Sequence, residues 1–192
     1  MQEEKQKRHS FYHKLRISGV MKTRLLFWII YAIVIVAIYC ISISAPKKVD
    51  VGIKQSTVYL IKQFEGLRNS AYDDGHGNMT IGIGHLIKPS EEKLYYTTMS
   101  NKQAHALLER DMRPCERVLK DRVGVNINQH QFDALMSFCH NIGPDNFANS
   151  EVIRQLNNNQ ARKAANAMLN WNKPETVIKR RRQERALFLS QI

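Results

Sequence analysis

Cysteine is scarce in this chain, and its histidines form no metal-binding pattern. The 192 residues contain three cysteines, too few for a scaffold built on disulfides, and seven histidines without a zinc-type Cys/His spacing. Residues 46–192 also lack internal repeats and low-complexity tracts. These absences exclude a disulfide-rich miniprotein, a repeat protein and a zinc-finger module. We expect no metal and no cofactor.

The three cysteines differ in their surroundings. Cys139 lies among apolar residues and is expected to be an inert buried thiol, whereas Cys115 lies in a more polar stretch and Cys40 in an apolar run. Three free thiols are therefore the expected state. A Cys40–Cys115 or Cys40–Cys139 bond becomes conceivable only if the apolar run leaves the membrane for an oxidising compartment.

Charge is absent from residues 25–44, which read LLFWIIYAIVIVAIYCISIS. Twenty uncharged residues form a helix of roughly 30 Å, the thickness of the hydrocarbon layer of a membrane. Seven Lys or Arg residues precede this run, and only Lys47 and Lys48 follow it closely. The positive-inside rule therefore places residues 1–24 in the cytoplasm and the remainder outside. A core helix of a soluble protein is the alternative, but such a helix is seldom apolar on every side.

The sequence leaves the fate of this segment open. A Ser-Ile-Ser sequence at 42–44 permits cleavage, whereas the length of the run favours a retained anchor. Translation can begin at Met1 or at Met21, because either start leaves a basic stretch ahead of the run. We divide the chain into a cytoplasmic basic tail (1–24), a transmembrane signal-anchor or signal sequence (25–44), a tether (45–53) and one folded domain (54–192).

Acidic residues are the minority, 17 against 29 Lys and Arg, which gives a net charge of +12. A basic domain outside the cytoplasm predicts an anionic partner, such as a cell-wall polymer, lipopolysaccharide or a membrane surface. Nucleic acid is the other usual partner of a basic protein, but export argues against it. The densest basic cluster, 179–182 with Arg185, alternates with apolar residues. This pattern predicts the charged face of an amphipathic terminal helix rather than a dedicated binding patch.

Hydrophobic patterning predicts an α+β domain with a small β-rich lobe and a larger helical lobe. Apolar residues at helical spacing end at Glu65, and the Gly-rich stretch 71–87 predicts a small hairpin or sheet. Ser100 and Asn128 are expected to cap two long helices. Further helices are expected at 146–156, 161–171 and 177–189.

Three side chains are suited to the hydrolysis of a glycosidic bond. Such enzymes use one carboxylic acid to protonate the leaving oxygen and a second carboxylate to handle water or the sugar cation. Glu65 suits the acid, because partial desolvation beside Phe64 and Leu67 favours its protonated form. Asp74, in a polar turn, is expected to stay ionised, and the Thr80 hydroxyl is expected to help hold a water molecule. The alternative interpretation is an ordinary solvated helix end followed by an ordinary Asp-Gly turn.

The order of these residues resembles the catalytic signature of the phage-type (T4-like) lysozyme family. Glu65 is followed after eight residues by Asp74 and after five more by Thr80, which runs into Ile-Gly-Ile-Gly-His. The resemblance covers roughly residues 54–190, and a match in so many parts is more specific than any single motif. Its further parts are Asn128–Leu135, Ser137-Phe138, Asn141–Gly143, Asn146-Phe147, Trp171-Asn172 and Arg181–Leu189.

The resemblance implies a lysozyme-like fold and a role for each of these residues. Glu65 is then the general acid, and Asp74 and Thr80 position or activate the water that attacks with inversion. The positions that match the family's cleft lining, and are expected to bind substrate, are Leu86, His140 and Ser150. His85 is expected to be structural, tying the β-rich lobe to a neighbouring element.

The implied activity is that of an endolysin for host lysis by a bacteriophage or prophage, cutting the β-1,4 bond between N-acetylmuramic acid and N-acetylglucosamine. The expected partners are peptidoglycan glycan strands and the inner membrane, through residues 25–44. The domain is then periplasmic, and a monomer once released. Three alternatives remain open. They are a non-catalytic wall-binding module, a basic protein that disrupts membranes through residues 179–185, and a transglycosylase, which needs only an acid/base Glu.

Overall fold

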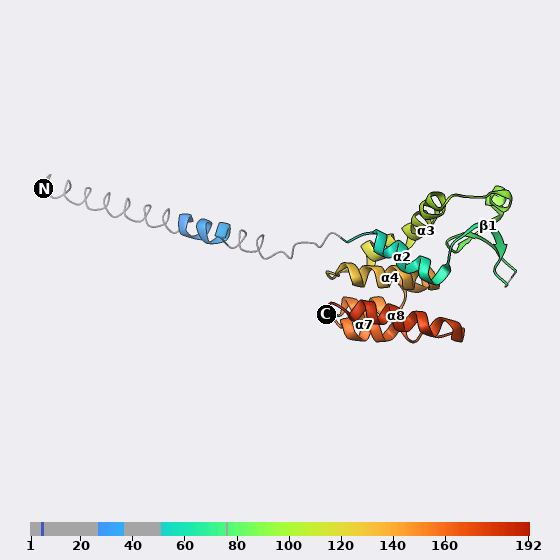
Figure 1. Ribbon diagram of the computed structural model, residues 1–192. Helices are drawn as coiled ribbons and strands as arrows, with labels where there is room; N and C mark the ends of the chain where they lie inside the picture. The colour runs from blue at the N-terminus through green and yellow to red at the C-terminus, as the bar shows by residue number, and fades with distance from the viewer. Residues whose placement is uncertain (1–4, 6–26, 37–50, 76) are drawn as a thin grey trace. The chain divides into compact units, whose positions relative to one another are not determined.

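The computed structural model describes residues 5, 27–36, 51–75 and 77–192, and the chain divides into two units, Met1–Lys47 and Lys48–Ile192 (Figure 1). In the first unit, residues 27–36 form a helix whose side chains are all exposed. No helix within the described residues is long and apolar enough to cross a membrane. The predicted span 25–44 is covered only at 27–36, so the rest of it, together with Cys40, lies outside the described residues.

The second unit has the small antiparallel sheet that the Gly-rich stretch predicts. Its three strands lie in the order β1-β2-β3. They comprise Arg68–Asp73, Met79–Gly82 and His85–Leu86. Thr80 on β2 pairs with Tyr72 on β1 and with Leu86 on β3. The β-rich lobe of the α+β prediction is therefore confirmed.

Helices make up the rest of the second unit, as the α+β prediction requires. The helices are α2 (Gln55–Glu65), η1 (Pro89–Tyr96), α3 (Asn101–Arg122), α4 (Gln129–Ile142), α5 (Pro144–Ala148), α6 (Glu151–Asn157), α7 (Ala161–Met168), η2 (Glu175–Val177) and α8 (Ile178–Leu189). Ser100 and Asn128 cap α3 and α4 as predicted, because each side chain accepts a hydrogen bond from the backbone three residues later.

Two helices differ from their predicted bounds. The expected helix 146–156 is two helices, α5 and α6, because the Ser150 hydroxyl caps α6 and donates to the carbonyl of Phe147 at 2.7 Å. The expected helix 161–171 ends at Met168. The Ser150 cap thus divides a stretch that apolar periodicity alone predicts as one helix.

Helix α4 is the centre of the core. Every residue from 131 to 139 is buried, and α4 packs against α2 and α8, between which it lies in Figure 1. A run of nine buried positions requires neighbours on all sides of the helix. The α4 helix is therefore the element on which the others are assembled.

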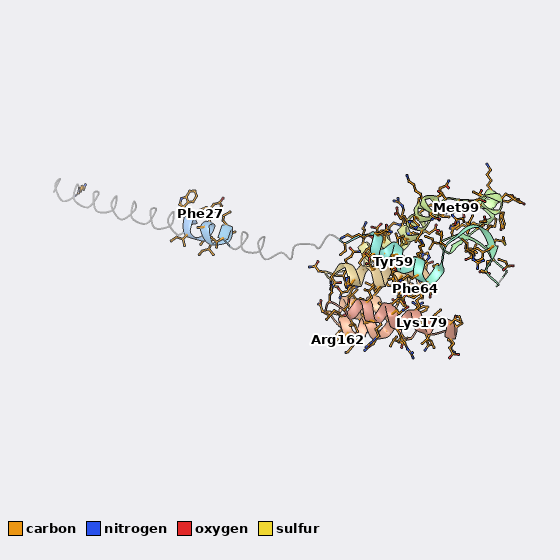
Figure 2. The ribbon with its side chains drawn as sticks, in the orientation of Figure 1. Phe27, Tyr59, Phe64, Met99, Arg162 and Lys179 are labelled. Atoms are coloured by element: carbon orange, nitrogen blue, oxygen red, sulfur yellow. A yellow bond between two sulfur atoms is a disulfide. The ribbon has the colours of Figure 1, made fainter. Side chains whose placement is uncertain are left out.

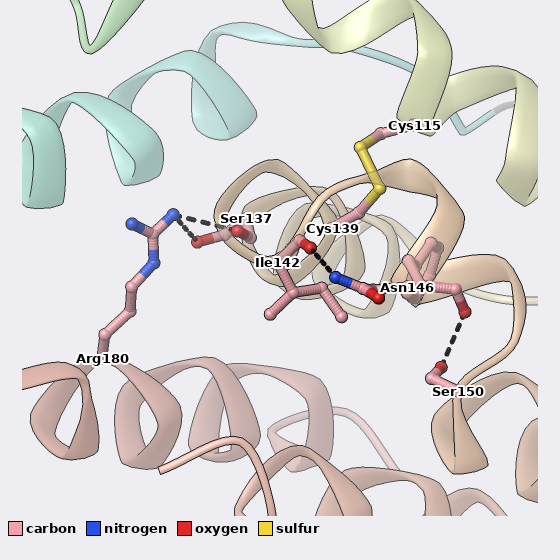
Figure 3. Close-up of a disulfide and its surroundings, with 8 residues drawn as sticks. Cys115, Ser137, Cys139, Ile142, Asn146, Ser150 and Arg180 are labelled. Atoms are coloured by element: carbon pink, nitrogen blue, oxygen red, sulfur yellow. Dashed lines mark hydrogen bonds between the residues drawn. A yellow bond between two sulfur atoms is a disulfide. The ribbon is translucent and has the colours of Figure 1, made fainter. Parts of the chain in front are cut away.

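Cys115 on α3 and Cys139 on α4 form a disulfide (Figure 3). The prediction of three free thiols is therefore wrong for this pair. Both cysteines are buried, at 2% and 0% exposure. Cys115 lies at helical spacing from Met112 and Leu119, both buried, so the core face of α3 carries it towards α4.

The last residues of the predicted tether lie against the domain. Val51 and Ile53 pack on the core. The carbonyl of Gly52 accepts a hydrogen bond of 2.9 Å from the side chain of Gln129 on α4, which also donates to Asp133 at 2.7 Å. Residues 51–53 therefore lead into α2 along a path that is fixed by contacts with α4.

Candidate active site

Glu65 is the last residue of α2, where the chain turns into the sheet. Gly66 follows with φ of +76°, a backbone conformation that favours glycine, and its N–H closes the helix by donating to the carbonyl of Lys62. The helix therefore ends at the residue that the motif singles out. The Glu65 side chain is 24% exposed, so solvent and a ligand can reach it.

A guanidinium lies against the Glu65 carboxylate. Nη1 of Arg180 on α8 donates to Oε1 of Glu65 at 2.6 Å, and the same guanidinium lies 4.7 Å from the ring centre of Phe64. The apolar surroundings expected for Glu65 are thus only partly observed. Phe64 lies close by, but the guanidinium of Arg180 contacts the Glu65 carboxylate. The Arg180 side chain is 8% exposed, so the pair is shielded from water on the α8 side.

The sheet also touches Glu65, through a glycine. A Cβ atom at Gly84 would lie 3.0 Å from Oε2 and 3.1 Å from Cγ of Glu65, and Gly84 has φ of +70°. Both features require glycine at this position. The turn between β2 and β3 therefore packs its backbone directly on the side chain of Glu65.

Asp74 is held by the turn between β1 and β2. Its Oδ1 accepts from the backbone N–H of Asn78 and its Oδ2 from the Asn78 side-chain amide, both at 3.1 Å. The backbone of Asp74 also donates to the carbonyl of Asn78. These bonds use the carboxylate as an acceptor and fix its orientation.

Thr80 and Leu86 lie opposite each other on β2 and β3, so their side chains are on the same face of the sheet. Thr80 is 7% exposed and Leu86 is 50% exposed. Thr80 also pairs with Tyr72, two residues before Asp74. The sheet register thus places Thr80 on β2 and Asp74 just past the end of the adjacent strand β1.

His140, near the end of α4, is half-buried close to the acid. Its burial lowers the pKa of His140, as does the charge of Arg180, while Glu65 and Asp111 act in the opposite direction without outweighing them. A neutral imidazole carries one donor and one acceptor and is suited to a sugar hydroxyl. The structure therefore brings His140 into the neighbourhood of Glu65.

Ser150 lies farther along the chain, in the α5–α6 connection. It is 6% exposed, and its hydroxyl is used by the helix cap described above. Its expected contact with substrate stays a prediction, as do those of Leu86 and His140.

His85 has the structural role that the sequence predicts. Its Nδ1 lies 2.6 Å from Asp111 on α3 and its Nε2 lies 3.0 Å from Glu91 in η1. Burial lowers the pKa of His85, but the hydrogen bonds and negative charges of Asp111 and Glu91 outweigh it and raise the pKa above its ordinary value. The side chain is 4% exposed, so it ties β3 to the helices and does not face substrate.

Sequence reasoning missed the basic residues of α8. Arg180 and Arg181 are 7% and 1% exposed, so the prediction that the whole 179–182 run is a solvated face is wrong for them. Both pair with Glu184, which is 0% exposed. The signal was present in the sequence, because Glu184 follows them at the i+4 and i+3 spacings of helical ion pairs.

A pocket of about 610 Å³ opens beside the Glu65–Arg180 pair. Phe64 of α2, Asn141 of α4 and Arg180 of α8 line it, together with Lys179, labelled in Figure 2. The remaining lining residues are Gln63, Thr176, Val177 and Gln183. Among residues 51–75 and 77–192, no group of three or more His, Cys, Asp or Glu side chains is placed to hold a metal ion.

Known proteins are similar to this chain in fold and in sequence. A family model described as phage lysozyme matches residues 62–185. The endolysin of Salmonella phage P22 is 40% identical over 143 residues, which cover 72% of this chain and 98% of that protein. The solved muramidase domain of SpmX from Asticaccaulis excentricus is 37% identical, with a TM-score of 0.64 over 72% of this chain and 98% of the other.

A third relative is the SAR-endolysin of Escherichia phage Mu, 27% identical over 140 residues, which cover 70% of this chain and 77% of that protein. The family match spans the sheet and all the helices from the end of α2 to most of α8. It therefore includes Glu65, the Asp74 turn, Thr80 and Arg180 within one alignment. The chain belongs to the phage lysozyme family.

Proposed function

We propose that this lysozyme hydrolyses the β-1,4 bond between N-acetylmuramic acid and N-acetylglucosamine of peptidoglycan, with inversion. Glu65 protonates the leaving oxygen, and Asp74 and Thr80 hold the attacking water. The observation that carries the proposal is the contact of Gly84 with Glu65, because it joins the helix end to the sheet that bears the other two groups. Inversion uses one carboxylic acid to protonate the leaving oxygen and a second carboxylate to activate water on the opposite face of the sugar.

The neighbours of each group support these roles. Arg180 fixes one oxygen of Glu65, and the other faces Gly84. Asn78 fixes both oxygens of Asp74. Groups held in this way lose little freedom when substrate binds, which is the main requirement for efficient acid catalysis. Leu86, exposed beside Thr80, and His140, half-buried near Glu65, are proposed to contact the sugar rings.

The chain is also proposed to be held at the inner membrane by residues 25–44, with the N-terminus in the cytoplasm and the domain in the periplasm. Residues 27–36 form a helix of apolar side chains, and Phe27 and Trp28 are 71% and 66% exposed. So large an exposed apolar surface is characteristic of a segment that enters a membrane or a partner. The similarity to the Mu SAR-endolysin supports a domain that is released from the membrane. We propose that the released domain is a monomer.

The catalytic proposal is tested by digesting purified peptidoglycan with the full-length chain, beside Glu65→Gln and a control, Glu116→Gln. Glu116 forms an exposed pair with Lys120 on α3, so its variant makes the same charge change away from the site. We expect reducing muramyl ends, read by mass spectrometry, from the wild type and the control only. Anhydro-muramyl ends would instead indicate a transglycosylase. In a separate assay on whole cells, lysis that survives Glu65→Gln would indicate a membrane-disrupting protein.

The membrane proposal has its own test, an Ile30→Lys/Ile33→Lys variant in cell fractionation. Two charges in the apolar helix oppose insertion by several kcal/mol, at about 2.5–3.5 kcal/mol each. The wild type is expected in the membrane fraction and the variant in the soluble fraction. Equal amounts of both proteins in the membrane would contradict anchoring through this segment.

A further inference from the structure

We propose that Glu184 is a positioning residue for the acid Glu65, acting through Arg180. This inference rests on the proposed function of Glu65. Glu184 does not touch Glu65, and it is 0% exposed, so neither water nor substrate reaches it. Its effect on the reaction is transmitted through one guanidinium.

Both oxygens of Glu184 are occupied by donors. Oε1 accepts from Nε of Arg180 at 2.9 Å and from the Ser137 hydroxyl at 2.7 Å. Oε2 accepts from Nη1 of Arg181. A buried carboxylate with this many charge-assisted bonds has a single orientation, because any other leaves a buried donor without its acceptor.

Arg180 is in turn held at every nitrogen. Nε donates to Glu184 at 2.9 Å. Nη2 donates to the backbone carbonyl of Ser137 at 2.9 Å, and Figure 3 shows this bond between Arg180 and Ser137. These bonds to α8 and α4 fix the plane of the guanidinium. Nη1 is then directed at Glu65, which it meets at 2.6 Å. The Glu65 carboxyl is thus aligned by a chain of bonds that starts at Glu184.

Arg181 completes the cluster without touching the acid. Its Nε donates to the carbonyl of Trp171 at 3.1 Å, and Nη2 donates to the side chain of Asn141. Its guanidinium also lies 4.8 Å from the ring centre of Phe138. Arg181 therefore fixes the second oxygen of Glu184, while Arg180 fixes the first.

Charge balance gives Glu184 a second effect on the acid. Two guanidiniums share one buried carboxylate, which leaves one positive charge to face Glu65. Without the Glu184 charge, two positive charges would oppose protonation of Glu65, and protonation is what an acid requires. The other titratable neighbour is His140 on α4, whose lowered pKa keeps it neutral near pH 7. Glu184 therefore orients the Arg180 guanidinium and also reduces the net positive charge that acts on Glu65.

The test compares Glu184→Gln and Glu184→Asp with wild type in the full-length chain, measuring kcat and KM for purified peptidoglycan across pH. Glu184→Gln is expected to lower kcat by about tenfold at unchanged KM and to move the alkaline limb of the kcat/KM profile down by about one pH unit. Glu184→Asp keeps the charge, so it is expected to lower kcat while the limb stays in place. Glu116→Gln, the matched charge control, is expected to match wild type in both.

A folded Glu184→Gln protein with wild-type kcat and pH profile would overturn the inference. If Glu184→Gln does not fold, Ser137→Ala decides, because it removes the 2.7 Å bond to Glu184 and a longer 3.3 Å bond from Nη2 of Arg180, but no charge. A fall in kcat of several-fold without a shifted limb then supports the inference, and an unchanged kcat overturns it. Failure of the proposed function is separate: there, wild type is inactive or Glu65→Gln is as active as wild type.

Discussion

Arg180 and Glu65 are 115 positions apart in the sequence, and their side chains meet at 2.6 Å. One comes from the last helix of the domain and the other from its first, and α4 packs against both. The acid of the site is therefore oriented by the C-terminal end of the chain. Changes in α8 are expected to affect catalysis although α8 carries none of the three proposed catalytic groups.

Two replacements of Arg180 separate its contribution to stability from its contribution to catalysis. Arg180→Met removes one partner of a buried ion pair, which typically costs about 3–5 kcal/mol of unfolding free energy. Arg180→Lys keeps the charge, but one ammonium cannot meet Glu184, Ser137 and Glu65 together. We expect Arg180→Lys to lose less stability in urea unfolding, yet to digest peptidoglycan about tenfold more slowly than wild type. Wild-type rates in a folded Arg180→Met protein would contradict a role in catalysis.

The sequence was sufficient to predict the elements whose ends are set by local signals. Helix α2 ends at Glu65 because glycine follows, and Ser100 and Asn128 cap their helices through their own side chains. The sheet follows from glycines in its turns. Each of these signals acts over a few neighbouring residues, so it can be recognised in a single sequence.

Burial of charge was not predictable in the same way. A run of four basic residues is usually solvated, and the partners that bury Arg180 lie on three elements, of which only Glu184 is near in sequence. The disulfide shows the same limit. Cys115 and Cys139 each lie on the buried face of a helix, but only the packing of α3 on α4 brings them together.

Gly84→Ala is expected to disable the site more than it destabilises the domain. The new methyl group would lie 3.0 Å from Oε2 of Glu65 and would displace the acid. The positive φ adds roughly 1–2 kcal/mol of strain. Gly143→Ala is the control for backbone strain without a new contact, because Gly143 has φ of +88° and ψ of +151°, a conformation open almost only to glycine, and open space at the Cβ position. Both variants should lose thermal stability, and Gly143→Ala should lose at least as much, whereas only Gly84→Ala should lose most of its lytic rate; equal rates would contradict the contact.

The His85 cluster is expected to make stability fall as pH rises above neutrality. The pKa of His85 is raised in the folded state by Asp111 and Glu91, against the opposing effect of burial, from an ordinary value of 6.5. Its contribution is therefore complete below about pH 6.5 and is lost as pH rises through the folded pKa. Each unit by which the pKa is raised corresponds to about 1.4 kcal/mol.

Urea unfolding of wild type and His85→Asn between about pH 5.5 and about pH 8.5 measures this contribution. The difference in unfolding free energy should be largest at the acidic end and shrink towards the alkaline end. The comparison isolates His85, because His140 and the exposed residues titrate in both proteins. A difference that is constant across this range would show that the imidazole is not charged in the fold.

The Cys115–Cys139 bond is expected to stabilise the domain once an oxidising compartment forms it. It closes a loop with a sequence separation of 24, which corresponds to about 3.5 kcal/mol in the chain-entropy description. Adding a thiol reductant should therefore lower the unfolding free energy of wild type by about this amount. A Cys115→Ala/Cys139→Ala protein should be equally stable with and without reductant, which controls for Cys40. If wild type is also insensitive and mass analysis after alkylation counts three thiols, the free-thiol state that the sequence favoured is correct, and α3 is held to α4 by packing alone.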